Sequence, residues 1–187
     1  MKSMLTEEDF KQAARDLSCE IAAIKAVAQV ETKAAGFQPN GEPTILFERH
    51  VFSRLTKGKF DKHAPDISNP KSGGYGKTSA QHGRMAKAAA LDRNAALMSA
   101  SWGVFQIMGE NYKQCGFKTL QEFINAMYRS ERDHLAAFVN FIKADLRLVM
   151  AIRAKNFTRF AQIYNGPGYA KNDYDTKMYT AYRSLRA

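Results

Sequence analysis

Apolar residues recur along most of this chain at spacings of three and four, the period of a helix that is buried on one side. Residues 6–18, 21–31 and 130–146 each carry such a stripe. Helix-forming Ala, Lys, Arg, Met and Gln are abundant, and long β-branched runs are absent. With 187 residues and 45% apolar content, the chain is expected to fold as one mainly α-helical domain over 1–187.

One segment departs from the helical pattern. Residues 44–48 are short, β-branched and aromatic, and they predict a strand followed by a short helix to about Leu55. Residues 58–77 are rich in glycine and serine, and they predict turns and an exposed loop holding a small hairpin. The expected fold is therefore mainly α (α+β), with a small β-hairpin or sheet region around residues 44–77.

Several helix ends are marked by side chains that can cap the backbone. Residues 6–9 and 119–122 each pair a threonine with an acidic residue three positions on, the signature of a capping box. Ser18 is expected to cap the helix that leads to Glu31. The segment after residue 78 predicts two helices with a break near Asp92.

The net charge limits the kinds of partner. A formal charge of +10 and a pI near 9.6 attract polyanions such as nucleic acid, anionic lipid or an acidic cell-envelope polymer. The sequence carries no recognisable nucleic-acid-binding module, which argues against nucleic acid. No run of about 20 apolar residues is present to span a bilayer. The opening MKSMLTEEDF lacks the apolar core of a signal peptide, so we expect cytoplasmic synthesis without a secretory signal.

Metal and thiol chemistry are not indicated. Cys19 and Cys115 lie far apart and outside any CxxC motif, so we expect free thiols and no disulfide framework. The stretch KSGGYGKTS resembles a phosphate-binding loop but lacks its spacing. We expect no metal and no cofactor. The four histidines show no metal-ligand spacing: His50, His63, His82 and His134.

Glu31 is an unusual residue for its position. It ends an apolar helix stripe that includes residues 24–28. Burial disfavours an ionised carboxyl, and so does the negative end of a helix dipole, so both effects are expected to raise the pKa of Glu31. A carboxyl that keeps its proton near neutral pH suits a general acid. The alternative is a surface glutamate at a frayed helix end, paired with Lys33 or Arg49.

A second carboxylate follows the predicted strand. Glu48 is flanked by Arg49 and His50 in the stretch TILFERH. Cleavage of a glycosidic bond needs two carboxyl groups: one protonates the leaving oxygen, and the other stabilises positive charge on the sugar or activates water. The alternative is that Glu48 pairs with Arg49 or a more distant cation and only stabilises the fold.

Two further stretches have the chemistry of a sugar-binding surface. ASWGVFQIMG and IYNGPGY combine aromatic rings, glycines and the amides of Gln106 and Asn165. Rings stack on sugar faces, and amides both donate and accept hydrogen bonds. The alternative for each stretch alone is ordinary core and a turn that ends a helix.

The order of these motifs resembles a known group of enzymes. A helix ending VAQVETKAAGF, then SWGVFQIM, then IYNGPGY is similar to the lysozyme-like superfamily, especially goose-type lysozymes and lytic transglycosylases. With ILFERHVF included, the chain looks closer to the N-acetylmuramidase family of phage endolysins. The resemblance covers about residues 10–182. One departure is that the Tyr-Asn-Ala-Gly of goose-type sequences is here Tyr-Asn-Gly-Pro-Gly, which leaves the contacts of that loop open.

The resemblance implies a lysozyme-like fold and cleavage of the β-1,4 bond between N-acetylmuramic acid and N-acetylglucosamine in peptidoglycan. By the matching motifs, Glu31 would be the general acid and Glu48 the second carboxylate. It also implies a single-module, monomeric lysin with no separate wall-binding module, which acts in the periplasm after holin-type release or from outside. Four residues would bind the substrate: Ser101, Gln106, Tyr164 and Asn165.

Two other functions remain open. A lytic transglycosylase uses one acid/base carboxyl and leaves anhydro-muramic ends, so a second carboxylate at Glu48 favours hydrolysis. The stereochemistry also stays open, because it depends on the separation of the two carboxyl groups. A non-enzymatic, cationic, membrane-active protein is the third possibility.

Residues 134–171 carry six basic residues against one acidic residue, interleaved with apolar side chains. Cationic amphipathic helices of this kind bind membrane interfaces. This region, when exposed or excised, is expected to disturb anionic outer-membrane lipids. In the folded protein, the favoured interpretation is that its apolar face is core and its charges face solvent.

Overall fold

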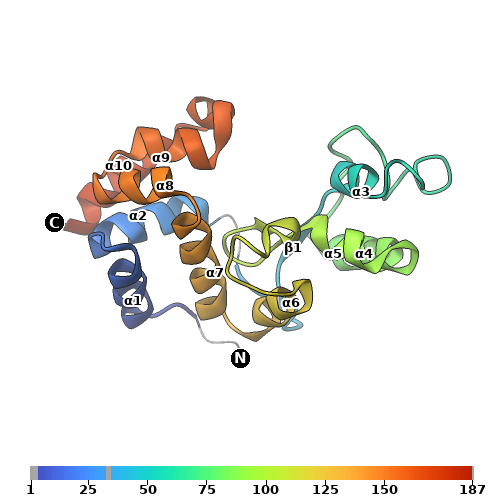
Figure 1. Cartoon of the computed structure of the whole chain (residues 1–187), viewed down its shortest axis with the longest axis horizontal. Helices are drawn as coiled ribbons and strands as arrows, with labels where there is room; N and C mark the ends of the chain where they lie inside the picture. The colour runs from blue at the N-terminus through green and yellow to red at the C-terminus, as the bar shows by residue number, and fades with distance from the viewer. Residues whose placement is uncertain (1–3, 33–34, 187) are drawn as a thin grey trace.

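The computed structural model describes residues 4–32 and 35–186, so Lys33 and Ala34 of the turn after Glu31 lie outside the described residues. It is mainly helical with a small three-stranded antiparallel sheet, which confirms the expected α+β class. Figure 1 shows two groups of helices at the ends of the long axis, joined through a central part.

The first group holds both ends of the described chain. α1 (Glu7–Leu17) and α2 (Ile21–Glu31) are grouped with three helices from the far end of the sequence: α8 (Leu146–Arg153), α9 (Phe157–Tyr164) and α10 (Tyr174–Arg186). Within this group, α2 packs on α1, α8 and α10. The closest association is between α2 and α10. The helix that carries Glu31 is therefore held by the C-terminal part of the chain.

The opposite group contains the strand β1 (Ile45–Phe47) and the helices α3 (Arg49–Leu55), α4 (Gln81–Leu91) and α5 (Arg93–Met98). A short 3₁₀ helix, η1 (Thr78–Ala80), leads into α4. α4 packs on β1 and α5, and Asp92 caps α5 through the backbone N–H of Ala95. The predicted break near Asp92 is therefore confirmed.

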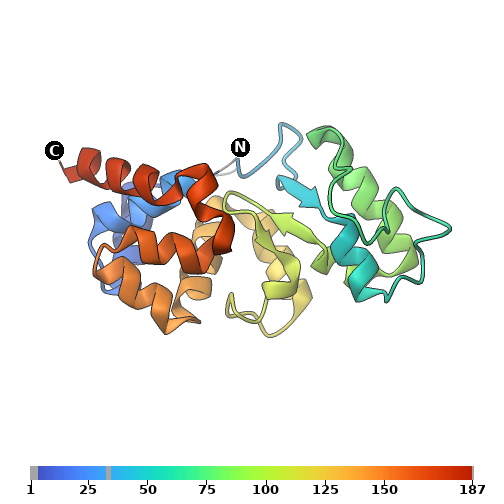
Figure 2. The ribbon, with the colours of Figure 1, turned by 90° about the horizontal axis from the view of Figure 1, so that it is seen from above.

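The central part consists of α6 (Leu120–Arg129), α7 (Glu131–Lys143) and the 3₁₀ helix η2 (Gly109–Asn111). α7 packs on α1, α6 and α8, so it joins the group of terminal helices to the rest of the molecule. Viewed from above, the strands lie between the two groups of helices (Figure 2).

The sheet has the order β1–β2–β3, with β2 (Ala100–Trp102) and β3 (Ile107–Met108) forming a hairpin. Leu46 lies opposite Ser101, and Ser101 opposite Met108. The sheet was expected around residues 44–77, but only β1 of its three strands lies there. Residues 58–77 form turns and a loop without a strand in this described segment. The hairpin instead lies at 100–108, where β2 pairs with its neighbour β3 and with the distant strand β1.

Both predicted capping boxes are confirmed, at the start of α1 and at the start of α6. The prediction for Ser18 is wrong. Ser18 adopts a left-handed conformation with φ 51 and ends α1, its backbone N–H donating to Ala14 and Arg15, whereas Glu20 occupies the N-cap of α2. The chain therefore turns sharply between the two helices instead of entering α2 through a serine cap.

Most of the apolar residues of 134–171 are buried, including Phe138, Ile142, Ile152 and Phe160. This confirms that the apolar face is core in the folded protein. No helix among the described residues is both long enough and apolar enough to cross a membrane.

Candidate active site

Glu31 is the last residue of α2, and only 3% of its surface is exposed. The helix buries its stripe of Ala, Ile and Val side chains, and the register of that stripe carries Glu31 inward with them. The amide of Asn165, which follows α9, donates a hydrogen bond to Oε1 of Glu31 at 3.0 Å. The alternative of a surface glutamate at a frayed helix end is therefore wrong: this carboxyl is buried and accepts a hydrogen bond from a residue 134 positions away.

Tyr164 precedes that asparagine and lies among aromatic rings. Its ring stacks on Phe160 and makes edge-on contacts with Phe138 and Phe141. Burial raises the pKa of Tyr164 well above its ordinary value, and the negative charge of Glu31 raises it further. Tyr164 is therefore a neutral phenol, and it lies near enough to Glu31 for the two groups to interact electrostatically. It also lines a cavity of about 520 Å³ between α7, α8 and α9.

Glu48 lies at the junction of β1 and α3, where it is the N-cap residue of α3. Its side chain is 16% exposed, and its Oε2 lies 3.1 Å from Nδ1 of His50. The expected alternative partner, Arg49, donates from Nε to the backbone carbonyl of Lys71. Glu48 is thus the more accessible of the two candidate carboxylates.

Glu48 lines a cavity of about 410 Å³ together with Ser101 and Gln106. The hydroxyl of Ser101 donates to Oε1 of Gln106 at 2.8 Å. The amide nitrogen of Gln106 donates to the carbonyls of Gly103 at 2.9 Å and Thr44 at 3.3 Å. Gln106 has a φ of 48, so these bonds hold a left-handed backbone at the hairpin turn.

The six predicted site residues therefore form two clusters. Glu31, Tyr164 and Asn165 form the acid cluster at the end of α2. Glu48, Ser101 and Gln106 form the sheet cluster.

Gly36 lies between the two clusters along the chain, where the backbone runs from α2 to β1. Its carbonyl accepts from Thr44 N at 2.9 Å, and its N–H donates to Glu131 at 3.2 Å. A Cβ at Gly36 would lie 2.7 Å from a methyl group of Val104 in the hairpin turn. Only glycine permits this close approach, which brings the chain leaving α2 against the sheet.

The chain is similar to known proteins over most of its length. The N-acetylmuramidase family matches residues 20–186. The chain also resembles the crystal structure of Burkholderia AP3 phage endolysin, with a TM-score of 0.92 and 42% identity over 98% of this chain and 72% of that chain. No curated protein matches the chain.

The chain belongs to the N-acetylmuramidase family. By this membership it is a peptidoglycan hydrolase, and the resemblance inferred from the order of the motifs is confirmed. Among the described residues of the muramidase, no group of three or more His, Cys, Asp or Glu side chains could hold a metal ion. Cys19 and Cys115 are free thiols, and burial raises the pKa of Cys19 to about 11 and of Cys115 to about 12.

Sequence reasoning missed one residue of the muramidase site. Burial raises the pKa of Tyr75, in the loop before η1, and the nearby negative charge of Glu48 raises it further. The sequence feature that could have indicated this residue is the stretch GGYG. A tyrosine flanked by glycines lies on a backbone that can adopt conformations closed to other residues.

Proposed function

We propose that this muramidase hydrolyses the β-1,4 bond between N-acetylmuramic acid and N-acetylglucosamine, with Glu31 as general acid and Glu48 as second carboxylate. The observation that carries the proposal is the burial of Glu31 at the end of α2, with the amide of Asn165 on one of its oxygens. A buried carboxyl favours its protonated form, which a general acid needs.

In the proposed reaction, the protonated carboxyl of Glu31 gives its proton to the bridging oxygen as the glycosidic bond breaks. The N–H of Asn165 stays on Oε1, so it fixes the carboxyl group and supports the negative charge that Glu31 acquires. The neutral phenol of Tyr164 beside Glu31 adds no competing charge.

Glu48 is proposed to meet the positive charge that develops on the sugar, or to take a proton from the attacking water. Its partial exposure and its place on the wall of a 410 Å³ cavity support this role, because water and sugar must both reach it. Ser101, Gln106, Tyr164 and Asn165 are proposed to shape the substrate surface. Because the amide nitrogen of Gln106 donates to two backbone carbonyls, we propose that Gln106 acts by fixing the conformation of the hairpin.

The test is Glu31→Gln, which removes the transferable proton but keeps the shape of the side chain. We expect wall hydrolysis to fall by about 10²–10⁴-fold, the usual contribution of a general acid, with an unchanged circular dichroism spectrum. Glu8→Gln is the matched control, because Glu8 is an exposed carboxylate on α1 and its loss leaves activity intact. Full activity in Glu31→Gln would contradict the enzyme mechanism and favour a non-enzymatic, membrane-active protein.

We further propose that the chain acts as one catalytic module on the cell wall, reaching it from the cytoplasm through a pore made by another protein, and thereby lyses the cell. Mass spectrometry of digested peptidoglycan tests the bond and the reaction. We expect reducing N-acetylmuramic acid ends, whereas anhydro-muramic ends would show a lytic transglycosylase.

The basic region 134–171 is proposed to disturb anionic membranes when it is released from the fold. In the folded chain, Leu146 and Met150 remain 74% and 69% exposed on α8 beside basic residues, while most of the other apolar side chains are buried. A synthetic 134–171 peptide is expected to release dye from anionic vesicles and not from neutral ones. Equal or absent release would contradict this proposal.

A further inference from the structure

The positive charge of the muramidase is concentrated in one group of helices. Residues 45–98, which contain β1, α3, α4 and α5, hold ten Lys or Arg residues against four Asp or Glu residues, a formal charge of +6. The rest of the chain shares the remaining +4 of the total +10. We call residues 45–98 the basic lobe, and its charge attracts anionic ligands to this end of the molecule.

Residues 56–68 follow α3 as a series of turns, and we call them the lysine arm. Lys57 and Gly58 have φ values of 55 and 72, so the arm leaves α3 through a sharp left-handed turn. The ring of Phe60 stacks on the buried ring of Phe52 in α3, with 5.8 Å between the two centroids. This packing holds the arm against α3.

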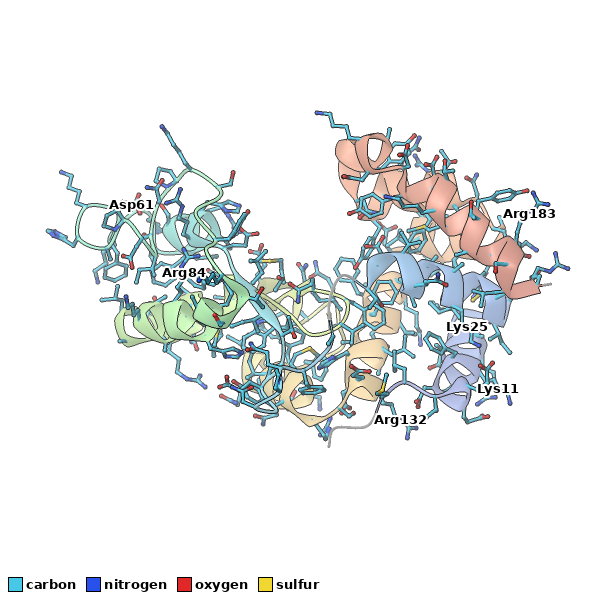
Figure 3. The ribbon with its side chains drawn as sticks, turned by 180° about the vertical axis from the view of Figure 1, so that it is seen from behind. Lys11, Lys25, Asp61, Arg84, Arg132 and Arg183 are labelled. Carbon is cyan, nitrogen blue, oxygen red and sulfur yellow. The ribbon has the colours of Figure 1, made fainter. Side chains whose placement is uncertain are left out.

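Asp61, in the middle of the lysine arm, points into the fold. Its Oδ2 accepts from the hydroxyl of Ser53 at 3.0 Å, and its Oδ1 accepts from the hydroxyl of Ser68 at 2.6 Å. Both serines are buried. The other acid of the arm, Asp66, lies 3.8 Å from Nζ of Lys87 on α4. Figure 3 shows Asp61 at the end of the molecule away from the terminal helices.

The cations of the arm face solvent. Lys57, Lys59 and Lys62 are exposed, and in the part of the chain that the structure describes none of them forms an ion pair with a carboxylate. The Lys and Arg side chains of the basic lobe that do form ion pairs are those of Arg54 and Lys87. Three ammonium groups on one short, well-packed segment are therefore free to bind an anionic ligand.

The surface of the lysine arm indicates which kind of anion it suits. Within residues 56–68, all of which are described, no large apolar side chain is exposed, because Phe60 is half-buried and Ile67 is buried. Binding to a membrane interface uses apolar side chains that enter it as well as basic ones. The arm therefore suits an anionic chain in water. In peptidoglycan, such anions are the carboxylates of the peptide stems, which are attached to N-acetylmuramic acid.

The length of α3 sets the distance between the arm and the sheet cluster. The helix has seven residues, so at about 1.5 Å per residue it is roughly 10 Å long. Glu48 precedes its first residue, and the lysine arm follows its last. An extended peptide spans about 3.3–3.6 Å per residue, so about three residues of a stem cover that length. A stem on a sugar bound beside Glu48 can reach the lysines.

We propose that the lysine arm binds the carboxylates of peptidoglycan peptide stems, so that the enzyme binds the peptide as well as the glycan. The inference rests on the cleavage at N-acetylmuramic acid proposed above, and it assigns a second part of the same substrate to the basic lobe. Lys57, Lys59 and Lys62 each present an ammonium group that can donate charge-assisted hydrogen bonds to a carboxylate.

The experiment removes the three charges of the arm together in the full chain: Lys57→Gln, Lys59→Gln and Lys62→Gln. The chain also carries Glu31→Gln, so that the wall is not digested, and binding to purified peptidoglycan sacculi is measured by sedimentation. We expect the Kd to rise about 3–30-fold, as for the loss of three exposed ion pairs, with an unchanged circular dichroism spectrum. The matched control removes the same charge from three exposed residues outside the basic lobe and should keep the Kd within about two-fold: Lys118→Gln, Lys177→Gln and Arg183→Gln.

Sacculi whose carboxylates have been amidated with a carbodiimide and ammonia separate the peptide from the glycan. On these sacculi we expect the arm variant to bind as well as its parent. An unchanged Kd on untreated sacculi, a loss that persists on amidated sacculi, or an equal loss in the control variant would overturn the proposal. Arm-dependent binding to phosphatidylglycerol vesicles, with unchanged binding to sacculi, would overturn it in favour of a lipid surface.

Digestion of the sacculi during the assay would have a different meaning. It would show that Glu31→Gln is active, which overturns the proposed mechanism. Stem binding would still be decided by the difference in Kd between the arm variant and the control variant.

Discussion

The two candidate carboxylates lie in contrasting regions. Glu31 ends a helix, is almost wholly buried, and is held by an amide from the far end of the chain. Glu48 lies between a strand and a helix, is partly exposed, and contacts His50. Two identical side chains thus have different surroundings: Glu31 is buried against an amide, and Glu48 is partly exposed beside an imidazole. The difference supports the different roles that we propose for the two side chains.

The comparison is tested most strongly at Glu48. Glu48→Gln removes the charge from the sheet cluster and is expected to lower hydrolysis by about 10²–10⁴-fold, with an unchanged fold. Hydrolysis of peptidoglycan, followed by the release of reducing ends, is the measurement. If Glu48→Gln keeps its activity while Glu31→Gln loses it, the chain needs one carboxyl only, and the contrast between the regions has no catalytic meaning.

The hairpin turn that joins the regions gives the next largest effect, on stability. Gly103 has a φ of +69, and a Cβ there would lie 2.6 Å from the ring of His134, whereas Gly41 has a φ of +82 with open space around it. Gly41→Ala should cost about 1–2 kcal/mol for the left-handed backbone alone. Gly103→Ala should cost at least about 1 kcal/mol more, because overpacking is added.

Chemical denaturation of the two alanine variants measures that difference. Equal losses in both would mean that the turn yields easily, and that the sheet cluster is not rigidly attached to α7.

A smaller effect is expected from the acid cluster. Asn165→Ala removes the donor to Glu31 and leaves the fold intact, and it should lower kcat by about 10–100-fold, since a hydrogen bond to a charged group contributes about 1.5–3 kcal/mol. Asn125→Ala is the control, because Asn125 is exposed on α6. Steady-state kinetics of both variants are the measurement, and unchanged kcat in Asn165→Ala would show that Glu31 needs no partner from α9.

The smallest effect concerns pH. Burial lowers the pKa of His134 below its ordinary 6.5, against the opposing charges of Glu131 and Asp133. Its Nδ1 accepts from Val104 N in the hairpin turn, and its Nε2 faces the carbonyl of Met127. Below pH 6.5 the unfolded chain takes up a proton that the folded chain resists, so the free energy of unfolding should fall as the pH falls.

Urea unfolding at several pH values, with His134→Gln as the comparison, measures this dependence. If the free energy of unfolding changes equally with pH in both proteins between pH 5 and pH 7, His134 does not cause the pH dependence.

Much of the acid cluster could be predicted from sequence, because it depends on local pattern. The stripe before Glu31 and its register are visible in residues 21–31, and the helix ends as predicted. The order of motifs implied only that Glu31 and Asn165 belong to one site. Their hydrogen bond was not predicted, since nothing local joins residues 134 positions apart.

The sheet cluster was harder to predict. β2 and β3 have three and two residues, too few to show the alternation of a strand, and their turn depends on the left-handed backbones of Gly103 and Gln106. The loop at Tyr75 is held against α4 by bonds that Gln81 and Arg84 donate to its backbone carbonyl. No spacing in the sequence encodes such bonds.

The bond between Asn165 and Glu31 also has a consequence for biosynthesis. The helix that carries Glu31 is made early, but its partner is added 134 residues later, which at about 5–20 residues per second takes roughly 7–27 seconds. Until then α2 also lacks α10, the helix with which it packs most closely. A nascent or truncated chain therefore has Glu31 without its hydrogen-bond partner, and with the role that we propose for Glu31 we expect activity only when the last helices are in place.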